Sequence, residues 1–113
     1  TGATLWTRGT DGDAQAIESL DGVIYVGGHF NRVCGFDTTG LKNCEADPAV
    51  RRRLVAFSGA GDLLPWDPDG NSSSGVWTLD GLADHSLAAG GAFTAMNAGT
   101  VVARRLAIFD PIS

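Results

Sequence analysis

The sequence predicts an all-β fold of short antiparallel strands, and three observations support this expectation. Glycine is frequent, with 16 of 113 residues, whereas the helix-favouring residues Lys and Glu together number only three. Short apolar runs are separated by Asp, Asn, Gly and Pro, which favour turns. Two sequence blocks also occur twice in the same order, which indicates two copies of one β unit.

Two blocks carry the repeat. The first is an apolar run followed by a Gly pair, one variable residue and a Phe, found at 23–30 (VIYVGGHF) and again at 86–93 (SLAAGGAF). The second is RRLVAF at 52–57, which returns as RRLAIF at 104–109. The first block recurs at an offset of 63 residues and the second at an offset of 52, so one copy is longer by 11 residues.

The extra length matches the span from Cys34 through Cys44, which we interpret as an insertion into the first copy. A third, looser match places Trp6 opposite Trp66. Three anchors in the same order make chance similarity an inadequate explanation.

Each unit is expected to contain four strands separated by turns at 21–22, 59–61 and 65–71. The first strand is predicted over 14–20 or 75–82, the second over 23–28 or 86–91, the third over 52–58 or 104–110, and the fourth is a short segment ending at Trp6 or Trp66. Four short strands in a unit of about 50 residues are typical of a β-propeller blade, a four-stranded antiparallel sheet.

The predicted boundaries divide the chain into about two blades. Residues 1–12 are expected to form the last strand of a preceding blade, 13–74 one complete blade with the insertion at 34–44, and 75–113 the first three strands of the next. Closed propellers contain about four to eight blades. We therefore expect either a segment of a longer propeller or a protomer of an oligomeric ring, with the remaining blades in the same parent chain or in other copies.

Composition and the cysteines restrict the expected binding partners and the expected cellular compartment. A net charge of −5 and a sequence pI of about 4.6 argue against nucleic acid as a partner, and the chain lacks the ~20 consecutive apolar residues required for membrane insertion. We expect Cys34 and Cys44 to form a disulfide, which implies a secreted, extracellular protein. The alternative is two reduced thiols in a surface loop, whereas zinc is disfavoured because there is no second Cys pair.

These blocks resemble those of secreted bacterial β-propellers with delta-60-like repeats. YVGGHF and AAGGAF are similar to the GGxF block of that family, RRRLVAF and ARRLAIF to its Arg-x-Leu-Ala block, and LPWDP to its Trp-Asn/Asp-Pro block. The resemblance covers nearly the whole chain and implies a blade scaffold, but it implies no particular activity. The chain departs from the family pattern in the 34–44 insertion and in LWTRGTDG, which lacks the Pro of the last block.

Three residues are predicted to contact a ligand. His29 fills the variable position of the GGxF block, where a ligand contact competes with a partly exposed strand-end His. Arg51 is the arginine of RRR without a counterpart in the other copy, and its planar fork suits a carboxylate, sulfate or phosphate. The other two arginines recur at 104–105, which favours a scaffold role such as pairing with turn aspartates. Trp77 is a sugar-stacking platform if it faces solvent, although its apolar strand favours packing in the core.

The turn after Trp66 is a candidate calcium site. Asp67, Asp69 and Asn71 alternate as in the first half of an EF-hand loop, but Ser72 and Thr78 stand where that motif requires Gly and Glu. The alternative is an Asp/Gly/Asn turn that links blades. Apart from this possible Ca²⁺, no cofactor is expected.

The sequence contains no recognisable hydrolase, phosphate-loop or zinc-protease signature. We therefore expect a non-catalytic, lectin-like recognition or scaffold module, with one propeller face binding a cell-surface glycan or a protein partner. Two alternatives remain: part of a secreted carbohydrate-active enzyme whose active site is completed by other blades, and a structural component of a secreted assembly.

Overall fold

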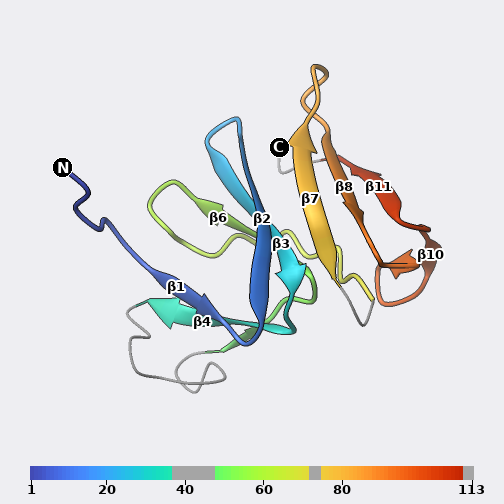
Figure 1. Ribbon diagram of the computed structural model, residues 1–113, viewed down its shortest axis with the longest axis horizontal. Helices are drawn as coiled ribbons and strands as arrows, with labels where there is room; N and C mark the ends of the chain where they lie inside the picture. The colour runs from blue at the N-terminus through green and yellow to red at the C-terminus, as the bar shows by residue number, and fades with distance from the viewer. Residues whose placement is uncertain (37–47, 72–74, 111–113) are drawn as a thin grey trace.

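The computed structural model describes residues 1–36, 48–71 and 75–110, and the regular secondary structure in these ranges is entirely β (Figure 1). In the part of the chain that the structure describes, no helix is long and apolar enough to cross a membrane. Two three-stranded antiparallel sheets form the body of the molecule. The first repeat sheet has the order β2 (Asp13–Leu20), β3 (Val23–His29), β6 (Leu54–Ser58), and the second has the order β7 (Val76–Gly81), β8 (Leu87–Gly91), β11 (Leu106–Phe109).

The two repeat sheets have the same strand pairing. In the first sheet Tyr25 pairs with Ala56 and Gly27 pairs with Leu54; in the second the equivalent pairs are Ala88 with Ile108 and Gly90 with Leu106. A β-bulge interrupts the first strand of each sheet at the same place, at Gln15 in β2 and at Trp77 in β7. The structure thus confirms the repeat and its first three strands.

In each unit a small hairpin that the sequence did not predict lies between the second and third strands of the repeat sheet. In the first unit β4 (Arg32–Phe36) pairs with β5 (Ala49–Val50), and in the second β9 (Ala95–Met96) pairs with β10 (Val101–Val102). The last pair before the hairpin tip encloses the 15 residues 34–48 in the first unit and the four residues 97–100 in the second. The 11-residue difference places the insertion at the hairpin tip.

The repeat sheets have three strands rather than the expected four. The segment before Trp66 contributes a single antiparallel β-bridge between Leu63 and Phe57, flanked by a hydrogen bond of 3.0 Å from Leu64 N to Ala56 O. Pro65 follows directly and has no N–H to donate, so the pairing ends there. At the other end of the chain, β1 (Arg8–Thr10) pairs with β4 in the small β1-β4-β5 sheet.

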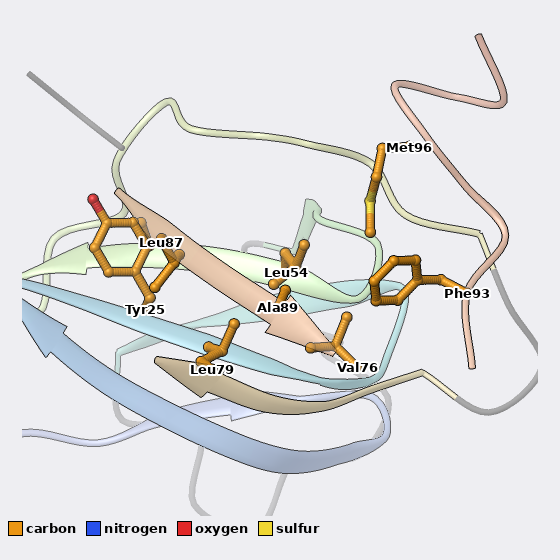
Figure 2. Close-up of a cluster of buried hydrophobic side chains, with 9 residues drawn as sticks. Tyr25, Leu54, Val76, Leu79, Leu87, Ala89, Phe93 and Met96 are labelled. Atoms are coloured by element: carbon orange, nitrogen blue, oxygen red, sulfur yellow. The ribbon is translucent and has the colours of Figure 1, made fainter. Parts of the chain in front are cut away.

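The main core lies between the two repeat sheets (Figure 2). Apolar side chains from both sheets, from the loop after β8 and from β9 meet there with at most 9% of their surface exposed: Tyr25, Leu54, Ala56, Val76, Leu79, Leu87, Ala89, Phe93 and Met96. Burial of this apolar surface is the main stabilising contribution to the contact between units.

Trp66 joins the two units from the connecting segment. Its ring lies 5.0 Å from that of Tyr25 and 5.5 Å from that of Phe109, in edge-to-face geometry on both sides. Trp6 occupies the equivalent place on the outer side of the first repeat sheet, where its ring lies 6.0 Å from that of Phe57. Because Phe57 and Phe109 are equivalent in the repeat, the predicted correspondence of the two tryptophans is confirmed.

Each repeat requires its glycine pair because neighbouring atoms lie very close to the backbone there. A Cβ on Gly27 would lie 2.6 Å from Cγ1 of Val76, so the first glycine lets the second unit approach β3. A Cβ on Gly28 would collide with the carbonyl of Asp13, and one on Gly91 with the carbonyl of Gly75. The second glycine therefore accommodates the neighbouring strand next to the bulge.

Replacing Leu54 with Ala should lower the free energy of unfolding by about 2–5 kcal/mol, because this fully buried side chain fills the core between the units. The matched control is Leu106→Ala at the equivalent position of the second sheet, where the side chain is 62% exposed and the expected change is within about 0.5 kcal/mol. Urea denaturation followed by tryptophan fluorescence measures both changes. Equal losses would contradict the observed packing of the two sheets.

Candidate functional site

The second arginine of each RRL block closes the hairpin onto the repeat sheet. Arg53 has a left-handed backbone with φ of 72°, and its N–H donates to Phe30 O at 3.0 Å while its carbonyl accepts from Gly28 N at 3.0 Å. Arg105 repeats this arrangement with φ of 73° and equivalent hydrogen bonds to Phe93 O and from Gly91 N. The conformation is rare for a residue with a side chain, so this turn is set by the surrounding structure.

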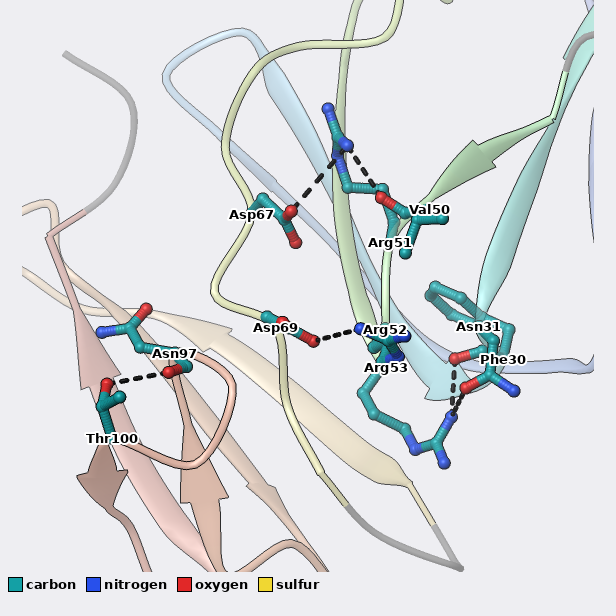
Figure 3. Close-up of polar contacts among 10 residues, drawn as sticks. All are labelled: Phe30, Asn31, Val50, Arg51, Arg52, Arg53, Asp67, Asp69, Asn97 and Thr100. Carbon is teal, nitrogen blue, oxygen red and sulfur yellow. Dashed lines mark hydrogen bonds and ion pairs between the residues drawn. The ribbon is translucent and has the colours of Figure 1, made fainter.

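The Arg53 side chain is buried, with 9% of the residue exposed. Its Nη1 donates to Phe30 O at 2.7 Å and to Asn31 Oδ1 at 2.8 Å (Figure 3). Burial lowers the pKa of the guanidinium, and the charge of Asp11 acts in the opposite direction. The side chain therefore stabilises the hairpin entry.

Arg51 and Arg52 pair with the aspartates of the turn that follows Trp66. Nη1 of Arg52 lies 3.4 Å from Asp69 Oδ1, and Nη1 of Arg51 lies 3.9 Å from Asp67 Oδ2 (Figure 3). Arg51 also donates to Val50 O at 2.8 Å and to Leu64 O at 3.2 Å. Of the two recurring arginines, Arg52 shows the expected pairing with a turn aspartate, whereas Arg53 donates to Phe30 O and Asn31 Oδ1. Arg51, which was predicted to contact a ligand, also lies against a turn aspartate.

The three predicted calcium ligands contact different parts of the protein. Asp67 and Asp69 face the two arginines, whereas Asn71 Oδ1 accepts from the backbone N–H groups of Thr94 and Ala95 at 2.9 and 2.8 Å. Asn71 thereby holds the start of β9 next to the connecting segment. Within residues 1–36, 48–71 and 75–110, no three His, Cys, Asp or Glu side chains lie close enough together to hold a metal ion. Calcium binding at this turn stays a prediction.

His29 and Trp77 lie at the surface, on separate elements. His29 is the exposed last residue of β3, as the strand-end alternative describes. Trp77 is 57% exposed, so the expectation that it packs in the core is wrong. The reason is the β-bulge, which breaks the inward–outward alternation of β7 at this residue. Gln15 stands at the equivalent bulge of β2, so the indole belongs to the second unit only.

An apolar cleft that the sequence analysis missed lies on the outer side of the first repeat sheet. Its cavity has a volume of about 370 Å³ and is lined largely by apolar side chains, among them Trp6, Ile17, Ile24, Val26 and Phe57. The guanidinium of Arg8 lies over the Phe57 ring at 5.5 Å and donates to Gly61 O and Cys34 O, which fixes the rim. The match between Trp6 and Trp66 in the repeat is the feature of the sequence that points to this cleft.

Cys34 is buried in β4, with 4% of its surface exposed. Cys44 lies outside the described residues, so the disulfide between them stays a prediction.

A scan against protein-family models gave no match to this chain, and searches of the curated proteins and of the solved structures gave none either. The repeat and the two sheets built from it are accordingly the strongest guide to function.

Replacing Arg53 with Ala should lower the free energy of unfolding by about 1–3 kcal/mol, because the buried hydrogen bond to Phe30 O and the partly buried one to Asn31 Oδ1 lose their guanidinium donor. Arg105→Ala is the matched control, since it has the same backbone conformation but an exposed side chain with one 3.3 Å hydrogen bond to Ala92 O. Its expected loss is below about 1 kcal/mol in the same denaturation assay. Equal losses would argue against the side-chain hydrogen bonds of Arg53 as the source of this stabilisation.

Proposed function

We propose that this chain is a non-catalytic, extracellular recognition or scaffold module built from propeller-type blades. The observation that carries the proposal is the repeat of sheets: two units share one core, and the outer face of each repeat sheet keeps exposed apolar side chains. Leu106 and Ile108 are 62% and 55% exposed on one outer face, and Ile17 is 72% exposed on the other. Exposed apolar surface of this kind marks a site of association.

The propeller assignment rests on the strand order of each unit and on the bridge at Leu63. An antiparallel meander with β2, β3 and β6 in sequence order is the arrangement of the inner strands of a blade. The Leu63–Phe57 bridge lies where an outer fourth strand would pair with the third. Additional chain, or a neighbouring copy, would be needed to lengthen this edge.

The extracellular assignment rests on the cysteine pair. We propose a Cys34–Cys44 disulfide that closes the insertion at the tip of the β4–β5 hairpin, in the manner of proteins from oxidising compartments.

Oxidised protein should be more stable than the same protein in reductant by about 2–3 kcal/mol, because the disulfide restricts the unfolded chain. Urea denaturation with and without dithiothreitol measures the difference. A Cys34→Ala/Cys44→Ala variant provides the control and should show no effect of reductant. An equally stable reduced protein would argue against the bond and against the inferred compartment.

The recognition role has one aromatic candidate. Trp77 presents its indole at the bulge of β7, where an apolar ring with a polar N–H suits a sugar that offers both C–H and hydroxyl groups. We propose a glycan as the ligand of this surface, with Trp77 as the stacking residue.

Trp77→Ala should weaken binding to a responsive glycan by about tenfold, which corresponds to the ~1.4 kcal/mol of one stacked ring. A panel of cell-surface polysaccharides, followed by isothermal titration calorimetry, supplies the measurement. Trp77→Phe should restore part of the affinity, because it keeps an aromatic face. Unchanged affinity in Trp77→Ala would remove this residue from the binding surface, and release of shortened saccharides from the panel would favour the enzyme alternative.

A further inference from the structure

We propose that a second copy of this chain docks head to tail on the first. The outer face of the second repeat sheet of one copy packs on the outer face of the first repeat sheet of the other copy. This inference rests on the proposed scaffold function and names its partner. The leading face is the outer side of the first repeat sheet, formed by Trp6, Ile17, Ile24, Val26 and Phe57. The trailing face is the outer side of the second repeat sheet, formed by Ala88, Gly90, Leu106 and Ile108.

The contact between the two units inside the chain is the template for this docking. There, the side of the first repeat sheet that carries Tyr25, Leu54 and Ala56 packs on the side of the second that carries Leu79, Leu87 and Ala89. A head-to-tail copy would repeat the same contact with the equivalent faces.

The trailing face reproduces one half of this template pair by pair. Gly90 beside Leu106 repeats Gly27 beside Leu54 in the same register. At the next pair the large and the small residue change places between the two strands. Ala88 pairs with Ile108 in the second sheet, whereas Tyr25 pairs with Ala56 in the first. A large and a small residue are present in both cases, and such exchanges of volume are tolerated well in packed interfaces.

The leading face reproduces the other side of the internal contact, which the second repeat sheet supplies. Ile17, Ile24 and Val26 stand at the positions of Leu79, Leu87 and Ala89, as the pairing of β2 with β3 and of β7 with β8 shows. Trp6 beside Phe57 repeats Trp66 beside Phe109. Within the chain Trp66 is covered on its other side by Tyr25, whereas the corresponding side of Trp6 borders the cavity.

Exposure distinguishes the outer faces from their templates. Leu54 and Ala56 are fully buried, but their counterparts Leu106 and Ile108 are more than half exposed. Likewise Leu79 is 9% exposed and its counterpart Ile17 is 72% exposed. Ile17, Leu106 and Ile108 are thus exposed at positions that the repeat buries elsewhere, whereas Phe57 on the leading face is already covered within the chain.

Because the two faces differ, the contact is heterologous and closes a ring only if its rotation allows; otherwise it extends as a filament. Each copy carries a net charge of −5, so copies repel one another at low ionic strength. Salt should therefore strengthen the association, as expected for an apolar contact between like-charged chains.

Light scattering after size-exclusion chromatography tests the proposal across protein concentration and salt. The wild type should form oligomers whose mass grows with concentration and salt, whereas Ile17→Asp and Ile108→Asp should each be monomeric under the same conditions. Val50→Asp is the matched control, because Val50 is 47% exposed on β5, away from both faces, and this variant should behave like the wild type. Circular dichroism must show that every variant keeps the β fold.

Mixing the two variants is the decisive measurement. Ile17→Asp keeps a usable trailing face and Ile108→Asp keeps a usable leading face, so an equimolar mixture should form a 1:1 dimer and nothing larger. A wild type that stays monomeric at all concentrations overturns docking by a second copy and leaves the faces to further blades of another source. Oligomers that persist in both variants, or a mixture without dimers, overturn the assignment of the faces.

These outcomes are independent of the proposed recognition function. Glycan binding at Trp77 is measured on monomeric Ile17→Asp protein as well as on wild type. A wild type that does not self-associate but binds the glycan would overturn only the head-to-tail proposal. Self-association without glycan binding would overturn only the glycan ligand.

Discussion

The close approach of the second repeat sheet to β3 is the constraint on which the rest of the structure depends. Gly27 makes it possible, because a Cβ there would lie 2.6 Å from Cγ1 of Val76. With the sheets this near, the apolar side chains between them exclude water, and Trp66 contacts both units at once. A smaller buried cluster of Phe30, Val33, Val55 and Phe57 lies on the other side of the first repeat sheet. The larger cluster lies between the two sheets, so each sheet buries apolar surface against the other.

The polar residues keep the connections in place around this core. Arg53 and Arg105 adopt the same left-handed turn and tie each small hairpin back to its sheet. Arg51, Arg52 and Asn71 hold the connecting segment between the units through its aspartates and through the start of β9. The arginine-rich segment, which resembles an anion site in the sequence, thus has contacts within the protein that account for its charge.

The difference between inner and outer faces links the architecture to the proposed role in binding. The same repeat positions are buried between the units and exposed on the outside, so the fold supplies surfaces suited to a neighbour of similar shape. Trp77 adds a separate feature, since its bulge occurs in both units but carries an indole only in the second. A rigid stack of sheets that presents one unit-specific aromatic residue is consistent with a scaffold that also recognises a ligand.

The sequence by itself determined the repeat, the first three strands of each unit and the place of the insertion, because apolar periodicity and recurring Gly, Phe and Trp anchors are local signals. It did not determine the small hairpins. In the first unit the pairing joins segments separated by the insertion, and in the second the paired strands have two residues each, too few for a periodic signal. Tertiary structure also decided that Trp77 faces outward, since a bulge overrides strand alternation, and that Arg51 contacts the connecting segment. The cleft beside Trp6 likewise depends on β1 folding back onto β4, a non-local contact that short-range patterns do not specify.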